Sequence, residues 1–281
     1  MRQFAANISI LFPTLPYMDR FRAAADAGFR TVETWWPDDA LAAGFTIDAI
    51  VREFETQGLE LALLNFAAGD MKGGDRGLAA DPERVEAFRA NVPVAIELAR
   101  RLGCHKLNAL AGNVLGDGER PGQLRLLADS LAFAADAAGK AGMSIMVEPL
   151  NAHDTPRYLL TGTAAAAELI DRVGRPNILI QFDVYHVVMA GEDPLEAIRR
   201  VGSRIGHVQL ADVPGRHEPG TGNVPFPAIL DALEAAGYHD TYGLEFAPLD
   251  PAAPQFGCVE RLGGALRPRS GRMPGHLPLS S

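Results

Sequence analysis

The feature that most constrains the fold is a unit repeated along the chain: a short β-branched or aromatic run, a polar turn, and then a stretch with helical periodicity. Several helical stretches end in glycine, as at Ala27-Gly28 and Gln57-Gly58. Glycine accepts the left-handed conformation that ends a helix, so these positions are stop signals. The eight strand candidates are residues 4–11, 30–35, 60–65, 106–110, 144–148, 178–183, 207–211 and 242–246.

Strands that alternate with helices imply right-handed crossovers and a parallel sheet. Eight such units in 281 residues favour a closed barrel of the α/β class, a (β/α)8 TIM barrel, folded as a single domain. The alternative is an open doubly wound sheet, which should carry a glycine-rich turn after its first strand. Phe12-Pro13-Thr14-Leu15-Pro16 stands there instead, so the sequence predicts the barrel.

The C-terminal end departs from the repeat. Residues 1–250 are predicted to form the barrel, and residues 251–281 an irregular basic segment with no sustained helical period. Within residues 255–281, four arginines (Arg261, Arg267, Arg269 and Arg272) stand against one acid, Glu260. Any closing helix is expected to be short and to lie near residues 258–262.

Charge and cysteine content exclude several classes of protein. A net charge of −9 makes a nucleic-acid or anionic membrane partner unexpected. Two cysteines cannot build a disulfide framework or a four-thiolate zinc site. No start resembles a signal peptide and no apolar run could span a bilayer, so we expect a cytoplasmic protein. The sequence leaves the oligomeric state open, a homo-oligomer included.

In a barrel of this type the active site lies at the C-terminal ends of the strands. The polar residues there are Asn7, Glu33, Asn65, Asn108, Glu148, Asp183, Gln209 and Glu245. The last four come from consecutive strands, and each interrupts an apolar run. An unpaired carboxylate at a barrel mouth is costly unless a cation or proton offsets its charge. Three carboxylates and an amide oxygen favour Mg²⁺ or Mn²⁺ over zinc, and Lys106 and Arg216 are the close basic alternatives.

At these residues the chain resembles the hydroxypyruvate isomerase family of the xylose isomerase-like barrels. The resemblance covers roughly residues 2–248. Its motifs are Phe4-Ala5-Ala6-Asn7-Ile8-Ser9, Ala67-Ala68-Gly69-Asp70, Val147-Glu148-Pro149-Leu150-Asn151, Leu160-Thr161-Gly162-Thr163, Gln181-Phe182-Asp183-Val184-Tyr185-His186, Gly206-His207-Val208-Gln209-Leu210-Ala211-Asp212, Glu218-Pro219-Gly220-Thr221-Gly222 and Leu244-Glu245-Phe246. The chain departs from the family at Ala247-Pro248, where the family usually has a lysine before the proline.

The resemblance implies a divalent-metal isomerase of a small hydroxy-carbonyl acid. It implies that Glu148 and Glu245 transfer the proton, and that both hold the metal together with Asp183 and Gln209. His186 and Arg216 are similar to family positions that contact substrate. Two amides at strand ends, Asn65 and Asn108, are expected to contact substrate as well.

The chemistry of the residues agrees with this implication. Converting a hydroxy-ketone to a hydroxy-aldehyde moves a proton between adjacent carbons through an enediolate, which a divalent cation stabilises. Hydroxypyruvate to 2-hydroxy-3-oxopropanoate is the reaction expected first. A 2-oxo-tetronate isomerase or a ketose 3-epimerase would need the same machinery. A metal-dependent endonuclease-type phosphodiesterase and a non-catalytic sugar-binding barrel are the remaining alternatives. The first of these would need a histidine-rich, multi-zinc mouth and a basic face, which seven histidines and the acidic charge do not favour.

Overall fold

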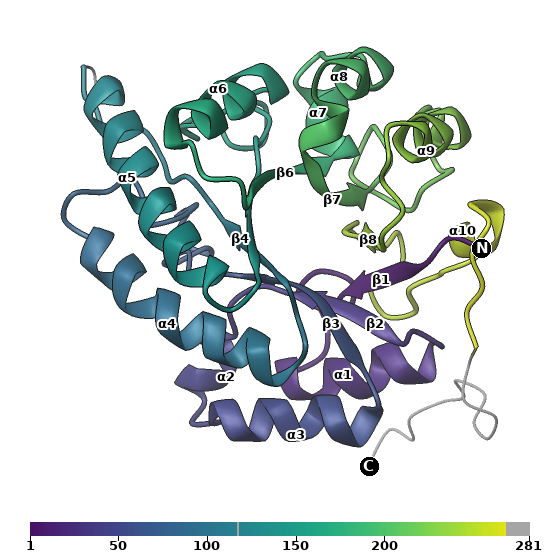
Figure 1. The fold of residues 1–281 in the computed structure, drawn as a ribbon. Helices are drawn as coiled ribbons and strands as arrows, with labels where there is room; N and C mark the ends of the chain where they lie inside the picture. The colour runs from purple at the N-terminus through teal and green to yellow at the C-terminus, as the bar shows by residue number, and fades with distance from the viewer. Residues whose placement is uncertain (117, 268–281) are drawn as a thin grey trace.

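Eight parallel strands close into a barrel in which each strand pairs with its neighbours in chain order and β8 pairs with β1 (Figure 1). The computed structural model describes residues 1–116 and 118–267. The strands are β1 Phe4–Asn7, β2 Thr31–Thr34, β3 Glu60–Asn65, β4 Lys106–Ala109, β5 Ser144–Val147, β6 Ile178–Asp183, β7 Ile205–Leu210 and β8 Tyr242–Leu244. The predicted (β/α)8 TIM barrel is confirmed.

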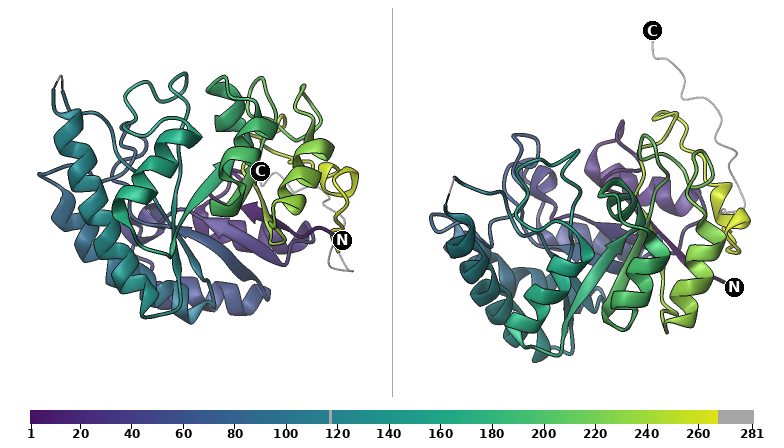
Figure 2. Two further views of the ribbon diagram at one scale, coloured as in Figure 1. Left: turned by 45° about the horizontal axis from the view of Figure 1, so that its top comes forward. Right: turned by 90° about the horizontal axis from the view of Figure 1, so that it is seen from above.

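Helices cover the outside of the barrel and join successive strands (Figures 1 and 2). They are α1 Tyr17–Asp26, α2 Asp38–Ala42, α3 Ile47–Gln57, α4 Val85–Arg101, α5 Arg120–Gly139, α6 Thr163–Val173, α7 Val184–Met189, α8 Pro194–Val201, the short 3-10 helix η1 Gly202–Arg204, α9 Phe226–Ala235 and α10 Cys258–Arg261. No helix among residues 1–116 and 118–267 is long and apolar enough to cross a membrane.

Helix α3 illustrates how the local sequence sets these elements. The Thr46 side chain accepts a hydrogen bond from the backbone N–H of Ala49 at 3.2 Å, which caps the first turn. Ile50 and Phe54, four residues apart, are both buried on the side that packs inward. Gly58 ends the helix at a φ of 60°, a left-handed conformation that residues with a side chain rarely adopt.

Strand β1 ends earlier than predicted. The sequence pattern extended it to Leu11, whereas the strand stops at Asn7. The side-chain oxygen of Asn7 accepts the backbone N–H of Ser9 at 3.1 Å, and its carbonyl accepts the N–H of Leu11 at 3.0 Å. Asparagine therefore turns the chain by bonding its own backbone nearby, and the apolar residues that follow pack in a turn rather than in the sheet.

The C-terminal segment contains the short helix that the sequence predicted, α10. It lies beside the start of β1 (Figure 1), where the backbone N–H of Arg2 donates to the carbonyl of Gly263 at 3.2 Å. Gly264 lies against the Phe4 ring, where any Cβ would approach ring carbons to 2.6 Å. Arg269 and Arg272 of the predicted basic segment lie outside the described residues, and the division of the chain at residue 250 stays a prediction.

Candidate active site

Four polar side chains predicted to meet lie at the C-terminal rim of the barrel. Asp183 ends β6, Gln209 lies in β7, and Glu148 and Glu245 directly follow β5 and β8. Asp183 is the register partner of Gln209, which in turn pairs with Gly243 of β8. All four residues are at most 4% exposed. The rim therefore holds three carboxyl groups and one amide with almost no access to bulk solvent.

The carboxyl groups of Glu148 and Asp183 form a tight group with the His186 imidazole. One ligand atom from each of these three residues lies within 4.8 Å of the others, so the group could hold a metal ion. Burial raises the pKa of Asp183 to about 6. Burial, followed by the charges of Glu245 and Asp183, raises the pKa of Glu148 well above its ordinary value. In both groups the largest cause is burial, which disfavours the ionised carboxylate, and the charge of Arg216 opposes it.

Arg216 joins two of these carboxyl groups. Its Nη2 donates to Glu245 Oε2 at 2.9 Å and to Asp183 Oδ2 at 3.2 Å. Glu218, an acid two residues after Arg216 in the chain, does not pair with it and instead accepts the backbone N–H of Leu249. Lys106, the other basic candidate, pairs with Asp240 at 2.7 Å. Arg216 is therefore the basic side chain that contacts the rim acids in the described structure.

A buried carboxylate organises the loop that carries Arg216. Asp212 accepts four backbone N–H groups, those of Val213 at 2.8 Å, Gly220 at 2.7 Å, Gly222 at 2.9 Å and Val224 at 3.1 Å. Gly222 packs so closely that a Cβ would lie 2.0 Å from the carbonyl oxygen of Val213. The loop is thus held by hydrogen bonds to the Asp212 side chain, and these bonds position the Arg216 guanidinium.

Glu245 is held by three donors from different parts of the rim. Its Oε1 accepts Asn7 Nδ2 at 2.9 Å and the indole Nε1 of Trp35 at 3.0 Å, and its Oε2 accepts Arg216. Burial raises the pKa of Glu245 to about 7, against the opposing effect of Arg216. A carboxyl group that titrates near neutral pH suits a general base or acid.

The ring of His186 is oriented by Asn151. The backbone N–H of Asn151 donates to Nδ1 at 3.1 Å, and its side-chain Nδ2 lies 2.7 Å from the same atom. Two donors on Nδ1 mean that the proton of the neutral ring is on Nε2, which lies 3.7 Å from Asp183 Oδ2. Burial, then Arg216, lowers the pKa of His186 well below its ordinary value. His186 is therefore a neutral hydrogen-bond donor toward the acid cluster.

Gln209 differs from the carboxylates in having both ends of its amide occupied. Nε2 donates to Glu33 Oε2 at 2.8 Å, and Oε1 accepts Gln181 Nε2 at 2.6 Å. An amide oxygen has two acceptor positions, so one remains free for another partner. The predicted role of Gln209 as a metal ligand is compatible with this arrangement and remains a prediction.

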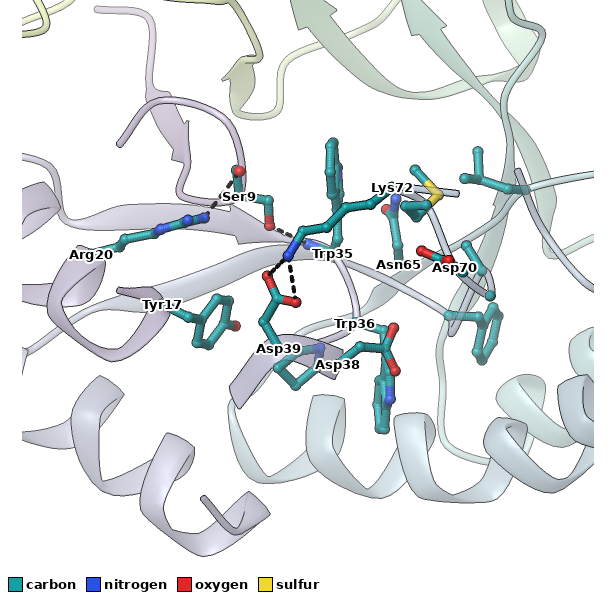
Figure 3. A pocket seen from close by; sticks show the side chains of 16 residues that line it. Ser9, Tyr17, Arg20, Trp35, Trp36, Asp38, Asp39, Asn65, Asp70 and Lys72 are labelled. Carbon is teal, nitrogen blue, oxygen red and sulfur yellow. Dashed lines mark hydrogen bonds and ion pairs between the residues drawn. The ribbon is translucent and has the colours of Figure 1, made fainter. Parts of the chain in front are cut away.

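The two predicted substrate amides are register partners on the neighbouring strands β3 and β4 but have different surroundings. Asn108 is buried, and its Nδ2 donates to Glu148 Oε2 at 2.9 Å while its Oδ1 has no partner within residues 1–116 and 118–267. Asn65 lines a cavity of about 250 Å³, which Trp35 also lines (Figure 3). In the wall of this cavity, Lys72 Nζ and Asp39 Oδ1 form an ion pair at 2.9 Å (Figure 3). The cavity adjoins the acid cluster through Trp35.

The donor set fits a hard divalent cation. Three buried carboxyl groups with raised pKa values face one guanidinium, so two further positive charges would offset them. Carboxylate and amide oxygens are the ligands that Mg²⁺ and Mn²⁺ prefer. His186 belongs to the compact group of possible ligands but would have to give up its Nε2 proton to bind a metal through that atom.

Sequence reasoning missed the residues that orient the site. Glu33 and Asn7 are among the polar strand ends but received no role in the prediction. Gln181 carries a signal that could have been used, because it lies two residues before Asp183 and therefore on the same face of its strand. Asn151 follows Glu148 within one quoted motif, yet its contact with His186 joins segments that no local pattern connects.

Comparisons with known proteins agree with the fold. A model of the family described as xylose isomerase-like TIM barrel matches residues 21–258. A Streptomyces coelicolor protein whose name carries hydroxypyruvate isomerase is 44% identical over 263 residues, covering 91% of this chain and 94% of that protein. The hydroxypyruvate isomerase of Escherichia coli is 36% identical over 88% of this chain and 94% of its own length.

A solved structure is also similar over most of its length. The crystal structure titled AP endonuclease, family 2, from Brucella melitensis superposes with a TM-score of 0.82 at 36% identity, covering 90% of this chain and 95% of that chain. The resemblance read from the motifs is thereby confirmed. This chain belongs to the xylose isomerase-like TIM barrel family, among the relatives of the hydroxypyruvate isomerases.

Proposed function

We propose that this protein is an isomerase of small hydroxy-keto acids that interconverts hydroxypyruvate and 2-hydroxy-3-oxopropanoate through an enediolate. The observation that carries the proposal is the buried carboxyl group of Glu245, held by Asn7, Trp35 and Arg216 at the same rim as the carboxyl group of Glu148. Isomerisation moves a proton between two carbons of a small substrate, and two such carboxyl groups of the protein are needed beside it. Relatives named hydroxypyruvate isomerase and 2-oxo-tetronate isomerase support this class of reaction.

We assign Glu148, Asp183, Gln209 and Glu245 as the residues that would hold Mg²⁺ or Mn²⁺. When bound, the cation would act as a Lewis acid that offsets the negative charge developing on the two substrate oxygens. The raised pKa values of the three carboxyl groups, caused first by burial, support this assignment, because a cation bound among them would favour their ionised form. No other cofactor is needed for the reaction.

We assign proton transfer to Glu148 and Glu245. One removes a proton from the hydroxyl-bearing carbon, and the other returns a proton to the adjacent carbon. Their strands lie three apart around the barrel, so the two groups approach a small substrate from different sides. Which of the two acts as the base in the forward direction follows from the configuration of the product.

The remaining residues bind and orient substrate. His186 can donate from Nε2 to a substrate oxygen, because Asn151 holds its other nitrogen as an acceptor. Arg216 offers its guanidinium to the substrate carboxylate beside the rim acids. Asn108 presents a free amide oxygen, and Asn65 lines the cavity next to Trp35, where a longer substrate such as a 2-oxo-tetronate would extend.

The proposal is tested by incubating purified protein with hydroxypyruvate in deuterated water, with and without chelator, and following the C3 protons by NMR. We expect exchange and isomerisation that chelator abolishes and Mg²⁺ or Mn²⁺ restores. A four-carbon 2-oxo acid and a panel of ketoses run in parallel identify the preferred chain length. Failure of every substrate to exchange deuterium with metal present would refute the isomerase proposal.

The same assay separates an endonuclease from an isomerase. The solved Brucella melitensis structure carries that title, so an oligonucleotide with an abasic site is included as a substrate. The net charge of −9 and a rim in which His186 is the one histidine of the acid group, within residues 1–116 and 118–267, do not favour a nuclease. We therefore expect no strand cleavage under conditions that support isomerisation.

A further inference from the structure

Glu33 has no role in the proton transfer, yet it lies directly beneath the site. It is fully buried in β2 and faces polar side chains from two other strands. Its Oε1 contacts His207 Nε2, and its Oε2 accepts Gln209 Nε2 at 2.8 Å. Asn7, which donates to Glu245 at 2.9 Å, also lies 3.5 Å from Glu33 Oε2. The Glu33 carboxylate thus lies next to both Gln209 and Asn7, the residue that donates to Glu245.

The contact with Gln209 has a direction that follows from chemistry alone. A carboxylate only accepts hydrogen bonds, so the end of the Gln209 amide that faces Glu33 must be the NH2 group. The oxygen of the amide then lies at the opposite end, where it accepts Gln181 Nε2 at 2.6 Å and keeps one acceptor position free. Rotating the amide by half a turn would place its oxygen against the negative charge of Glu33.

The barrel leaves space for this carboxylate. Gly243 lies in β8, and a Cβ at that position would approach Glu33 Oε1 to 2.1 Å. The residue at position 243 must therefore lack a side chain, because a Cβ there would overlap the space that the Glu33 carboxylate fills between β7 and β1. The absence of a side chain at Gly243, together with three neighbouring donors, makes this a built position for a carboxylate.

We propose that Glu33 is a positioning residue that holds the NH2 group of the Gln209 amide toward itself and the amide oxygen away from it, so that the site binds a divalent cation through oxygen. The inference rests on the proposed function, because it assumes that the rim binds a metal. Glu33 touches neither substrate nor cation in this account. It acts through Gln209, and its other carboxylate oxygen contacts His207 Nε2.

The test replaces the carboxylate with an amide of the same shape. In Glu33→Gln, the new side chain offers one oxygen to the several donors around it, so an NH2 group can meet Gln209 and the orientation of its amide is no longer enforced. We expect the Mn²⁺ dissociation constant, measured by isothermal titration calorimetry, to rise about 10–100-fold, the usual effect of losing such a partner. Glu234→Gln, a remote substitution of the same kind, should leave it unchanged.

Two double variants separate positioning from general stability. Combined with Gln209→Ala, Glu33→Gln should weaken Mn²⁺ binding little beyond the effect of Gln209→Ala alone. Combined with Gln209→Glu, it moves the carboxylate from position 33 to position 209, where the amide at 33 can donate to it. We expect this charge-relocated variant to bind Mn²⁺ within a few-fold of wild type. A structural role for Glu33 would predict neither result.

The outcomes distinguish this inference from the proposed function. Wild-type protein that binds no Mn²⁺ would refute the metal site and this inference with it. Wild-type binding that Glu33→Gln leaves within about twofold would refute the positioning role alone. Should Glu33→Gln fail to fold, the charge-relocated variant decides, because it retains the same number of charges and donors. A folded relocated variant with lost Mn²⁺ affinity would also overturn the positioning role.

Discussion

Arg216 donates to Glu245 over 2.9 Å, and the two residues come from a loop after β7 and the end of β8. The same nitrogen of Arg216 lies 3.2 Å from Asp183, so a single guanidinium joins two carboxyl groups that both have raised pKa values. Arg216 thus connects the carboxyl groups of the rim to the loop that the Asp212 side chain holds in place.

Removing the guanidinium should therefore disable the site. In Arg216→Met, two buried carboxyl groups lose their partner, which typically costs about 3 kcal/mol or more. We expect kcat/KM for the preferred substrate to fall at least 100-fold, while Arg216→Lys keeps part of the activity because it keeps the charge but loses the planar fork. Steady-state kinetics with both variants checks this. Equal activity of Arg216→Met and wild type would show that the guanidinium has no role in turnover.

The proton-transfer residues make the strongest prediction. Glu148→Gln and Glu245→Gln keep the shape of the side chain and remove its ability to accept a proton, so each should lower kcat at least 1,000-fold, within the usual effect of a general acid or base. Exchange of substrate C3 protons with deuterium, followed by NMR, shows which variant loses proton abstraction. Near-normal turnover in either variant would contradict its assigned role.

Substitution of His186 should separate a donor from a metal ligand. Because Asn151 donates to Nδ1, the Nε2 proton serves substrate, so His186→Ala should lower kcat/KM about 100-fold and change the Mn²⁺ dissociation constant less than threefold. His239→Ala, at an exposed position, serves as the control. Loss of Mn²⁺ binding in His186→Ala that matches the loss of activity would make the histidine a ligand instead.

Metal binding should release protons in a pH-dependent way. Without a cation, burial raises the pKa of Asp183 to about 6 and that of Glu245 to about 7, so both groups carry protons at pH values where carboxyl groups are ordinarily ionised. A divalent cation binds the ionised form. Mn²⁺ affinity should therefore rise between pH 5.5 and about pH 8, and proton release should fall over the same range.

Calorimetry in buffers with different ionisation enthalpies measures this release. The expected trend has a clear sign, because raised carboxyl pKa values mean that protons must leave as the metal binds. In Glu245→Gln, the part of the release that belongs to Glu245 should disappear. Proton release that is zero at pH 6 would mean that the carboxyl groups are already ionised in the free protein.

The Asp212 carboxylate should matter for stability as well as activity. Asp212→Asn replaces one acceptor oxygen with an NH2 group that faces backbone N–H groups now held at 2.7–3.1 Å. Leaving buried donors unpaired costs about 2–3 kcal/mol, which for a chain of this size lowers Tm by about 5 °C. Thermal denaturation followed by circular dichroism tests the stability effect. A Tm within 1 °C of wild type would show that the loop does not depend on this carboxylate.

The sequence alone determined the barrel and the rim at which its polar residues gather. Strands alternating with helices form parallel sheets, and parallel strands place all their C-terminal ends on one side, so Glu148, Asp183, Gln209 and Glu245 had to share a rim. The helix end at Gly58 and the short helix near Cys258 could also be predicted, because each depends on residues that are close along the chain.

Only the tertiary structure decided how those residues are connected. Arg216 reaches Glu245 rather than the nearby Glu218, Asn151 sets the protonated nitrogen of His186, and Glu33 faces Gln209 across 176 positions of the chain. Each partner is selected by strand register, loop shape and burial, which depend on the whole barrel being closed. A pattern read along the chain records which donors and acceptors are available, whereas their pairing is a property of three-dimensional packing.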